Sequence, residues 1–407
     1  MFSESVIQLA IMERRASWVH EVLTRQVQEI LPSRKGLESL MKKRKIRLYL
    51  GVDSTSPQLH LGHAIPLRKL KQFQELGHEV ILLFGTFTAQ IGDPSGRDKQ
   101  RQPLSRQTVE ANVASYKQQA GKVLDLSRTK ILSNGRWLEK IKLPDFLELS
   151  SHVTVSQLLG RDMFQGRLQK GGEVWVNEFL YPLLQGYDSV AMDVDLEIGG
   201  TDQTFNMLVG RKLQEVYHHK EKFVLTTPLL LGLDGRKMSK TYGNTVNLLD
   251  PPQEMYGKLM SLRDELIIHY FEMCTEVPLP EIKKREEMLR QRILSPRDAK
   301  AELAKEVVSL YHGENQAQRA AQEFNRVFRE KQIPSQMPRL ILQREKLPLV
   351  ELLVKTKLAR SKNEARRLVE QGGVRVAGEI QRDWAKQVEI KKDTIFQVGK
   401  RRFFRIG

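Results

Sequence analysis

A short stretch around residue 50 constrains the fold of this chain more than any other part of the sequence. Residues 47–52 are short and mostly apolar, which is typical of a buried central strand. Residues 53–58 combine Asp, Ser, Thr and Pro, the chemistry of a turn. Apolar residues then recur about every third position from Leu61 to Leu76, and Gly77 closes the run. The stretch therefore predicts a strand, a turn and the start of a helix.

Three residues, His60, Gly62 and His63, fall at the N-terminus of this predicted helix, just past the carboxyl end of the strand. Residues 79–85 are a second apolar strand, so a β–α–β unit with parallel strands is expected. In an open α/β sheet, ligands bind at the carboxyl ends of the strands. Free N–H groups at a helix N-terminus favour phosphate. The sequence thus indicates an α/β fold with a phosphate site at this edge.

Other loops are expected at the same edge of the sheet. Residues 86–97 follow the second strand and contain two Gly, a Pro and an Asp, although a plain connecting loop would have the same composition. Residues 193–198 are a further strand candidate, followed by a Gly-rich turn that ends in Asp202 and Gln203. Residues 234–241 form a loop that contains Gly235 and two Lys three positions apart, and its composition is that of a mobile segment.

One predicted helix carries an unusual polar face. Tyr181, Gln185 and Asp188 have the spacing i, i+4 and i+7, which places them on one side of the helix. Polar groups buried without partners are costly, so these three side chains either face solvent or line a polar pocket.

Charge and cysteine content limit the class of protein. The 407 residues carry a net charge of +17, which favours a polyanionic partner over a plain solvated surface. The single cysteine, Cys274, allows neither an internal disulfide nor a thiolate metal cluster, which fits a reducing compartment. No apolar run reaches membrane-spanning length and no secretory pattern opens the chain, so no membrane partner and a cytoplasmic location are expected.

Changes in composition and apolar spacing along the chain divide it into five expected segments. We expect an N-terminal helical segment (1–45), a Rossmann-like catalytic domain with a doubly wound parallel sheet (46–250), a helical domain (251–332), a Pro-containing linker (333–346) and a small basic α+β domain (347–407). The helical segment is predicted from apolar residues spaced for one face, namely Ile7, Ile11, Trp18, Val22 and Ile30.

The basic C-terminal segment suggests a nucleic-acid partner. From residue 346 onward there are 16 Lys and Arg against 7 Asp and Glu, about half of the total excess. Arg360, Lys362, Arg366 and Arg367 are predicted on neighbouring helical turns, where they would form one phosphate-facing surface. The alternative is a solvated basic face without a ligand.

Two motifs taken together indicate a family. His60-Leu-Gly-His63 and Lys237-Met-Ser-Lys240, in this order and at sheet edges, resemble the two ATP-binding motifs of class I aminoacyl-tRNA synthetases. Tyr49-Leu-Gly-Val-Asp53, Ile91-Gly-Asp-Pro-Ser95, Tyr181-Pro-Leu-Leu-Gln-Gly-Tyr-Asp188 and Gly199-Gly-Thr-Asp-Gln203 are similar to motifs of the bacterial-type tyrosyl-tRNA synthetases. The tail around residues 360–369 resembles the S4-like RNA-binding domain of that family. The resemblance spans residues 47–407 and is least specific in the helical segment.

The resemblance implies roles for individual residues. For tyrosine binding it implies Tyr49, Thr88, Asp93, Tyr181, Gln185, Asp188 and Gln203, with Tyr49 and Asp188 at the phenol. For ATP binding it implies Gly51, Asp53, His60, Gly62, His63, Asp202, Lys237 and Lys240, of which His60, His63, Lys237 and Lys240 are the catalytic residues. Leu50 departs from family members with a polar or thiol group there, which puts only a weak ribose contact in doubt.

The resemblance also implies the reaction and its partners. L-Tyrosine and ATP would give tyrosyl-adenylate and pyrophosphate, and the tyrosine would pass to tRNA(Tyr), whose anticodon the helical domain would recognise. Mg²⁺ would arrive with ATP, no cofactor would be bound permanently, and the family is homodimeric through its Rossmann domain. A metal site at His60 and His63 is disfavoured because no third ligand has suitable spacing.

Two other functions remain open from the sequence. One is a related enzyme, either a synthetase for another aromatic amino acid or a nucleotidyltransferase with the same histidine motif. The other is a non-enzymatic RNA-binding protein derived from a synthetase, against which the two histidines and two loop lysines argue.

Overall fold

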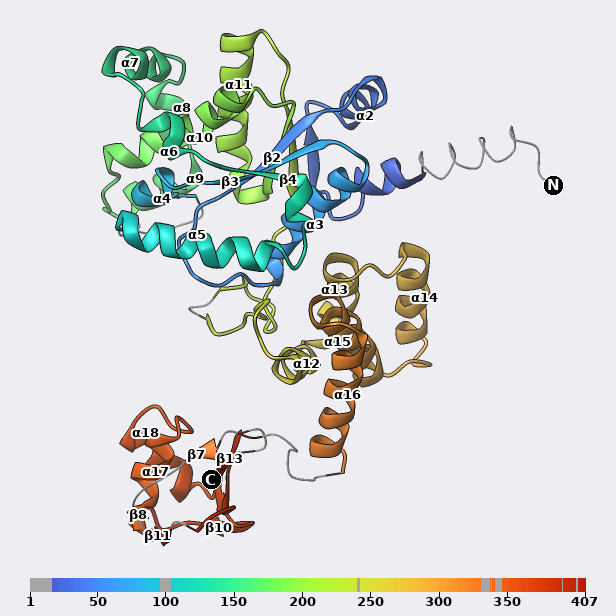
Figure 1. Cartoon of the computed structure of the whole chain (residues 1–407), viewed down its shortest axis with the longest axis vertical. Helices are drawn as coiled ribbons and strands as arrows, with labels where there is room; N and C mark the ends of the chain where they lie inside the picture. Colours follow the sequence, from blue (N-terminus) through green and yellow to red (C-terminus); the bar gives the residue numbers. More distant parts are fainter. Residues whose placement is uncertain are drawn as a thin grey trace, which may run out of the picture. The chain divides into compact units, whose positions relative to one another are not determined.

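The computed structural model describes residues 17–95, 104–239, 242–330, 337, 339–340, 346–389, 391–399 and 402–407. The chain divides into two units, residues 1–320 and 321–407, which are coloured along the sequence in Figure 1. The predictions for Ile7, Ile11, Lys240 and most of the expected linker lie outside the described residues.

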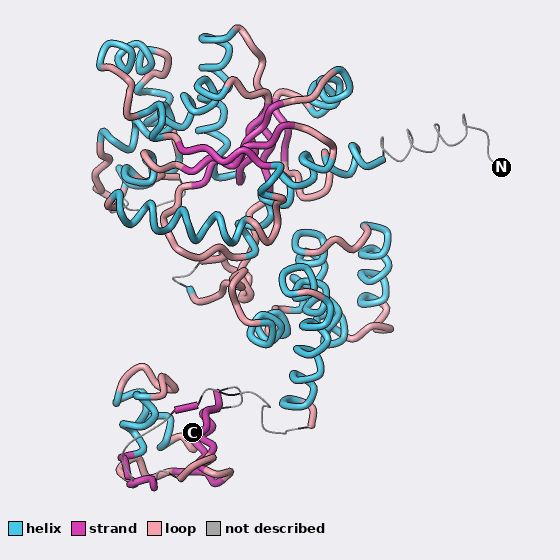
Figure 2. Tube along the Cα trace, in the orientation of Figure 1, coloured by secondary structure: helices cyan, strands magenta, loops and turns pink. Residues whose placement is uncertain are grey.

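A six-stranded sheet forms the centre of the first unit, with helices packed around it (Figure 2). Its order is β1-β6-β5-β2-β3-β4, and all neighbours are parallel except the antiparallel edge pair β1–β6. The strands are β1 (Glu29–Leu31), β2 (Arg47–Val52), β3 (Glu79–Phe84), β4 (Thr129–Ser133), β5 (Leu196–Gly200) and β6 (Phe223–Thr227). The chain passes from β2 toward β3 on one side and from β5 toward β6 on the other, so the order reverses between β2 and β5. This is where ligands bind in such sheets.

Strand β2 is central, as its sequence predicts. Leu48 and Tyr49 are fully buried and Leu50 is 3% exposed, because β2 has hydrogen-bonded neighbours on both sides and helices over the sheet. Helix α3 (Leu61–Glu75) follows and contacts β2, β3 and β5. The predicted β–α–β unit and the α/β fold class are confirmed.

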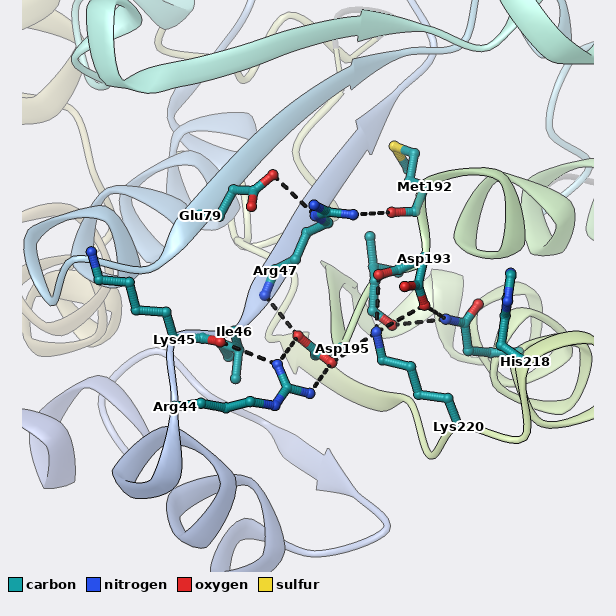
Figure 3. Close-up of polar contacts among 12 residues, drawn as sticks. Arg44, Lys45, Ile46, Arg47, Glu79, Met192, Asp193, Asp195, His218 and Lys220 are labelled. Carbon is teal, nitrogen blue, oxygen red and sulfur yellow. Dashed lines mark hydrogen bonds and ion pairs between the residues drawn. The ribbon is translucent and has the colours of Figure 1, made fainter.

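Ionic contacts fix the amino end of β2 (Figure 3). The buried Asp195 carboxylate accepts hydrogen bonds from the Arg47 backbone N–H at 2.8 Å and from both terminal nitrogens of Arg44 at 2.6 and 2.9 Å. Lys220 Nζ lies 3.0 Å from the same carboxylate. Burial alone would raise the pKa of Asp195, but the bonds from Arg44, Arg47 and Lys220 outweigh it and hold that pKa below its ordinary value. The contacts anchor the start of β2 beside β5.

The remaining helices of the α/β region are mostly short. They are α2 (Arg34–Lys43), α4 (Thr88–Ile91), α5 (Arg106–Ala120), α6 (Gly135–Leu138), α7 (Leu143–Ser151), α8 (Val155–Leu159), α9 (Asp162–Gln169), α10 (Val176–Met192) and α11 (Thr204–His218). Helices α10 and α11 pack closely because two glycines face each other. A Cβ built on Gly186 would lie 3.1 Å from the backbone nitrogen of Gly210.

Five helices make up the next part of the chain, as its composition and helical spacing predict. They are α12 (Pro252–Met260), α13 (Ile267–Cys274), α14 (Leu279–Arg290), α15 (Pro296–His312) and α16 (Glu314–Phe328). The end of α13 is joined to α3 because Arg68 donates to the carbonyl oxygens of Met273 and Thr275. Beside it, the fully buried Lys69 donates to the carbonyl oxygens of Val22 and Arg25, each at 2.7 Å.

The second unit is a small α+β structure. Helices α17 (Leu349–Lys355) and α18 (Lys362–Glu370) accompany a sheet of order β10-β9-β12-β13-β7 and a separate pair β11–β8. Its strands are β7 (Arg339–Leu340), β8 (Lys346–Pro348), β9 (Val374–Val376), β10 (Glu379–Gln381), β11 (Gln387–Glu389), β12 (Ile395–Val398) and β13 (Arg402–Ile406). Phe396 and Phe404 stack in its core with ring centroids 4.7 Å apart.

Three expectations differ from the structure. Ile30 was expected on a helix but lies in β1, where it pairs with Leu225 of β6, because a sheet edge competes for a short apolar run. Arg339 and Leu340 were expected in the linker but form β7 beside β13. Arg360 precedes α18 rather than lying on it, since Ser361 caps the helix and the Arg360 backbone N–H donates to Glu364 at 2.7 Å.

Within the described part of the chain, no helix has both the length and the apolar character needed to cross a membrane.

Candidate active site

A cavity of about 240 Å³ opens at the carboxyl ends of β2, β3 and β5. Its wall unites most of the residues that the sequence predicts for the site, namely Tyr49, Gly51, Asp53, His63, Thr88, Asp93, Tyr181, Gln185, Asp188 and Gln203. The polar face of α10 thus lines a pocket rather than solvent, which decides between the two alternatives left open by its spacing.

One end of the cavity holds Tyr49 and Asp188. The Asp188 carboxylate accepts from Trp137 Nε1 at 2.8 Å and from Asn134 Nδ2 at 3.2 Å, which fixes its orientation. Burial raises the pKa of Asp188 well above its ordinary value, and these two hydrogen bonds oppose the shift. Tyr49 OH shares a 3.0 Å hydrogen bond with Ser189 Oγ, and burial raises the pKa of Tyr49 too. A phenol-sized group entering here would meet a hydroxyl and an oriented carboxyl.

Asp53 lies at the turn after β2 and is held by two hydroxyl groups. Thr88 Oγ1 donates to it at 2.7 Å and Tyr181 OH donates at 2.9 Å. Gly85 makes the approach possible, because a Cβ there would lie 2.0 Å from Asp53 Oδ1 and 2.3 Å from Thr88 Oγ1. Burial is also the main cause that raises the pKa of Tyr181, so this phenol stays neutral and donates. The end of β2, the start of α4 and α10 therefore meet at one carboxylate.

A cluster of amides surrounds Asp93. Gln203 Nε2 donates to Asp93 Oδ2 at 2.7 Å, and the Ser95 backbone N–H donates to Asp93 Oδ1 at 2.9 Å. Asn206 Nδ2 donates to Gln185 Oε1 at 3.0 Å and to Gln203 Oε1 at 3.2 Å. A carboxylate ringed by amides can hold a cation such as a primary ammonium group.

The two histidines sit at the beginning of α3, as predicted. His60 has extended backbone at the N-cap, and its N–H donates to His63 Nδ1 at 3.2 Å. Their ring centroids are 3.8 Å apart. Gly62 leaves room for this arrangement, because a Cβ there would lie 3.1 Å from the His60 ring. His63 lines the cavity, whereas His60 and Gly62 are not among its lining residues.

Asp202 and Lys237 approach each other from different parts of the chain. Lys237 Nζ lies 3.8 Å from Asp202 Oδ2, and its side chain is 55% exposed. Burial raises the pKa of Asp202, and the charge of Lys237 opposes the shift. Lys237 can thus reach a ligand bound beside the turn after β5. Lys240 is outside the described residues.

The Lys237 loop is fastened by Asn244. Its Nδ2 donates to Asp234 Oδ1 at 2.8 Å and to the Lys237 carbonyl at 3.2 Å, while its Oδ1 accepts from the Ser239 N–H at 2.8 Å. The hydrogen bond from Asn244, together with those from Arg236, lowers the pKa of Asp234 to about 2. The described part of the loop is therefore held at its base.

Several residues of the cavity wall were not found from the sequence. Glu197 lines the cavity, and Ser189, Lys222, Asn206, Asn134 and Trp137 hold lining residues in place. Glu197 gives a local signal, since a charged residue inside an apolar strand needs a partner. Its partner Lys222 has no such signal, because the contact joins positions 25 residues apart.

The described residues contain no group of three or more His, Cys, Asp or Glu side chains that could hold a metal ion.

In the second unit, the predicted basic residues are exposed. Lys362, Arg366 and Arg367 lie on α18, and Arg360 precedes its N-cap residue Ser361. The Arg366 guanidinium lies 4.4 Å from the centroid of the Trp384 ring, which is 39% exposed. A cation stacked on an exposed aromatic ring is the kind of surface that suits RNA.

Comparison with known families places this geometry in a class. The family model "tRNA synthetases class I (W and Y)" matches residues 41–329, so the chain is a class I tRNA synthetase by this model. A second model, "Tyrosine--tRNA ligase SYY-like C-terminal domain", matches residues 330–406. Together with the relatives that follow, these matches show that the chain belongs to the tyrosine–tRNA ligase family. The family expected from the sequence is confirmed.

Two curated relatives span almost the whole chain. The tyrosine–tRNA ligase of Thermotoga maritima is 46% identical over 388 residues, 95% of this chain and 96% of the relative. That of Moorella thermoacetica is 43% identical over 400 residues, 97% of each chain.

Solved structures agree on the fold. A C-terminally truncated mitochondrial tyrosyl-tRNA synthetase from Aspergillus nidulans has a TM-score of 0.63 at 24% identity, covering 78% of this chain and all of that one. A tyrosyl-tRNA synthetase from Archaeoglobus fulgidus, complexed with L-tyrosine, has a TM-score of 0.60 at 22% identity, covering 75% and 99%. At these identities the likeness concerns the fold alone.

Proposed function

We propose that this chain joins L-tyrosine to tRNA(Tyr) in two steps, with the cavity at the β2 and β5 ends as the site of both. In the first step, a tyrosine carboxylate oxygen bonds to the α-phosphorus of ATP and the bond to the β-phosphate breaks, giving tyrosyl-adenylate and pyrophosphate. In the second, the ribose hydroxyl of the terminal adenosine attacks the tyrosyl carbonyl and AMP leaves. The main support is the cavity itself, whose wall unites Tyr49 and Asp188 with Asp93 and His63.

The phenol of the substrate would bind between Tyr49 and Asp188. The hydrogen bonds from Trp137 and Asn134 orient the Asp188 carboxyl so that it can accept a hydrogen bond from the phenol. Phenylalanine lacks the hydroxyl, would leave these buried groups one hydrogen bond short and would be rejected, a rule for which tyrosyl enzymes are themselves the best-known example. The ammonium group would bind at the other end, near Asp93, Tyr181 and Gln185, with Gln203 and Thr88 completing the pocket.

Activation would depend on position and charge rather than on a general base. The tyrosine carboxylate is already ionised at pH 7, so no proton has to be removed. His60, Gly62, His63 and the α3 N-terminus would face the phosphates. Gly51 and Asp53 would face the nucleotide, and Asp202 its ribose. Lys237 and Lys240 would hold the leaving pyrophosphate, and Mg²⁺ would enter with ATP as part of the substrate.

The basic surface on α18 would bind tRNA, and the helices from residue 251 to 332 would recognise the anticodon. Arg360, Lys362, Arg366 and Arg367 are the proposed phosphate contacts. We place the protein in the cytoplasm, where tRNA and ATP are available.

We also propose a homodimer formed through the α/β region. Large apolar side chains are exposed on α7, α8 and the start of α10, and a second copy would cover them. Leu143, Leu147, Val155, Trp175 and Val176 are each at least half exposed. Light scattering should give twice the chain mass, and Leu147→Asp should shift it toward one chain.

Tyrosine-dependent exchange of pyrophosphate into ATP tests the function. With every amino acid supplied separately, exchange is expected with tyrosine only. Exchange with a different amino acid would identify a related synthetase, and no exchange at all would indicate the non-enzymatic RNA-binding alternative. Asp188→Ala should abolish exchange, whereas Asp298→Ala, an exposed carboxylate in the first turn of α15, should not. Normal exchange by Asp188→Ala would refute the assignment of the phenol site.

A further inference from the structure

A fully buried lysine lies behind the wall of the cavity. Lys222 directly precedes β6 and is 0% exposed, and its Nζ forms an ion pair with Glu197 Oε2. The same ammonium donates to Ser189 Oγ at 2.7 Å and to the Met207 carbonyl at 3.2 Å. A buried lysine is costly unless it is paired, so these three acceptors are what keep it in place.

The partners of Lys222 extend to both ends of the cavity. Glu197 Oε1 accepts from Gln185 Nε2 at 3.1 Å, on the side proposed for the ammonium group of the substrate. Ser189 Oγ shares its hydrogen bond with Tyr49 OH at 3.0 Å, on the phenol side. The Lys222 ammonium therefore contacts Glu197, which holds Gln185, and Ser189, which holds Tyr49. Gln185 and Tyr49 are proposed to bind opposite ends of the ligand.

The charge of the wall makes this lysine important. Four carboxylates line the cavity, Asp53, Asp93, Asp188 and Glu197, and the described lining residues contain no Lys or Arg. Glu197 is 2% exposed, so without Lys222 it would be a buried charge whose remaining partners, the Gln185 amide and the Tyr49 phenol, carry no positive charge. Burial lowers the pKa of Lys222, and Glu197 beside it acts in the opposite direction and favours the charged form.

The packing of α10 against α11 leaves space for the lysine head. A Cβ on Gly210 would lie 2.6 Å from Lys222 Nζ and 2.7 Å from Ser189 Oγ. Only a glycine fits at this position without displacing the ammonium or its acceptor. Gly210 thus leaves the space that the Lys222 ammonium and Ser189 Oγ occupy between the two helices.

We propose that Lys222 is a positioning residue of the tyrosine pocket, which neutralises Glu197 and holds Gln185 and Tyr49 in the orientation that binds tyrosine. This role rests on the proposed function, because it assigns the cavity to tyrosine. Lys222 does not line the cavity and would act through its neighbours, without touching the substrate or the phosphates.

The test is Lys222→Met, which keeps an unbranched side chain only one atom shorter and removes its charge. In tyrosine-dependent ATP–pyrophosphate exchange, we expect KM for tyrosine to rise about tenfold or more, since a 1.4 kcal/mol loss of binding is tenfold. KM for ATP should change less than about twofold, because the effect is confined to the tyrosine pocket. A general loss of structure would instead raise KM for both substrates. An unchanged KM for tyrosine would overturn the proposal.

A second substitution separates positioning from general stability. Lys222→Met with Glu197→Gln leaves no unpaired buried charge, so the double variant should recover much of the lost tyrosine affinity. A double variant no better than Lys222→Met would contradict the role of charge neutralisation. Lys69→Met is the matched control, because Lys69 is equally buried but bonds to Val22, Arg25 and Gln72, away from the cavity. It should lower the unfolding midpoint and leave KM for tyrosine unchanged.

Ser189→Ala keeps the ion pair and tests the phenol side if Lys222→Met does not fold. It should lower the preference for tyrosine over phenylalanine in kcat/KM about tenfold, with KM for ATP unchanged. An unaltered preference would overturn the link between Lys222 and Tyr49. Exchange by the wild-type protein with tyrosine tests the proposed function separately, so the two failures are distinguishable.

Discussion

The Gly186→Ala variant tests whether the fold and the site require the close approach of α10 to α11. The added methyl would lie 2.9 Å from Leu213 Cδ1, 3.0 Å from Val209 Cγ1 and 3.1 Å from the Gly210 backbone nitrogen. The side chains can rotate, but the backbone nitrogen cannot, so α10 has to shift outward. Overpacking of this kind costs about 1–3 kcal/mol.

A helix-propensity gain of about 1 kcal/mol offsets part of that cost, because alanine favours a helix interior over glycine. Gly257→Ala isolates this gain. Gly257 lies within α12, and a Cβ there meets nothing within 4 Å. Gly257→Ala should therefore stabilise the protein by up to about 1 kcal/mol. The difference between the two variants gives the clash alone, about 1–3 kcal/mol.

Urea denaturation followed by circular dichroism gives both free energies of unfolding, provided that the m values agree. The shift of α10 should also raise KM for tyrosine, because this helix carries Tyr181, Gln185 and Asp188. If Gly186→Ala proves as stable as Gly257→Ala, the close approach of the two helices does not constrain the site and the reasoning is wrong.

Three further outcomes are expected. Lys237→Met should lower kcat of exchange by about tenfold to a hundredfold, with tyrosine affinity unchanged in equilibrium dialysis, if Lys237 acts on phosphate charge that develops in the transition state. The carboxyl carbon of Asp234 should titrate near pH 2 in NMR spectra, and Asn244→Ala should raise that pKa toward its ordinary value. Because the folded pKa is depressed, the stabilisation from Asp234 is present above its ordinary pKa and is lost as the pH falls toward 2. Arg366→Ala should weaken tRNA binding and reduce its salt dependence, without affecting exchange in the absence of tRNA.

Local patterns predicted the part of the site that lies at strand ends and helix starts. The period of α3, the turn after β2 and the spacing of Tyr181, Gln185 and Asp188 are properties of neighbouring residues, and the structure keeps all of them. The sequence could not distinguish a solvent-facing from a pocket-lining α10, because that depends on which elements pack against it.

Contacts between residues far apart in the chain could not be predicted from the sequence, because they too depend on which elements pack together. The Lys222–Glu197 pair and the Tyr49–Ser189 bond join residues whose local surroundings do not imply each other. For Ile30, the local pattern gave a wrong prediction. Its apolar spacing fits a helix, but the edge of β6 offers it backbone hydrogen-bond partners and it joins the sheet. The roles of the individual site residues remain predictions until they are tested by substitution.

The antiparallel edge pair β1–β6 has a consequence for the order of events during synthesis. Glu29 of β1 pairs with Thr226 of β6, so the first strand of this described sheet to leave the ribosome waits for the last one. At typical elongation rates this delay is on the order of ten to forty seconds. After β1, strands β2, β3 and β4 appear next and are neighbours in the sheet, β5 then adds to β2, and β6 adds to β5. We therefore expect this sheet to grow from its centre outward, with its earliest synthesised strand docking last.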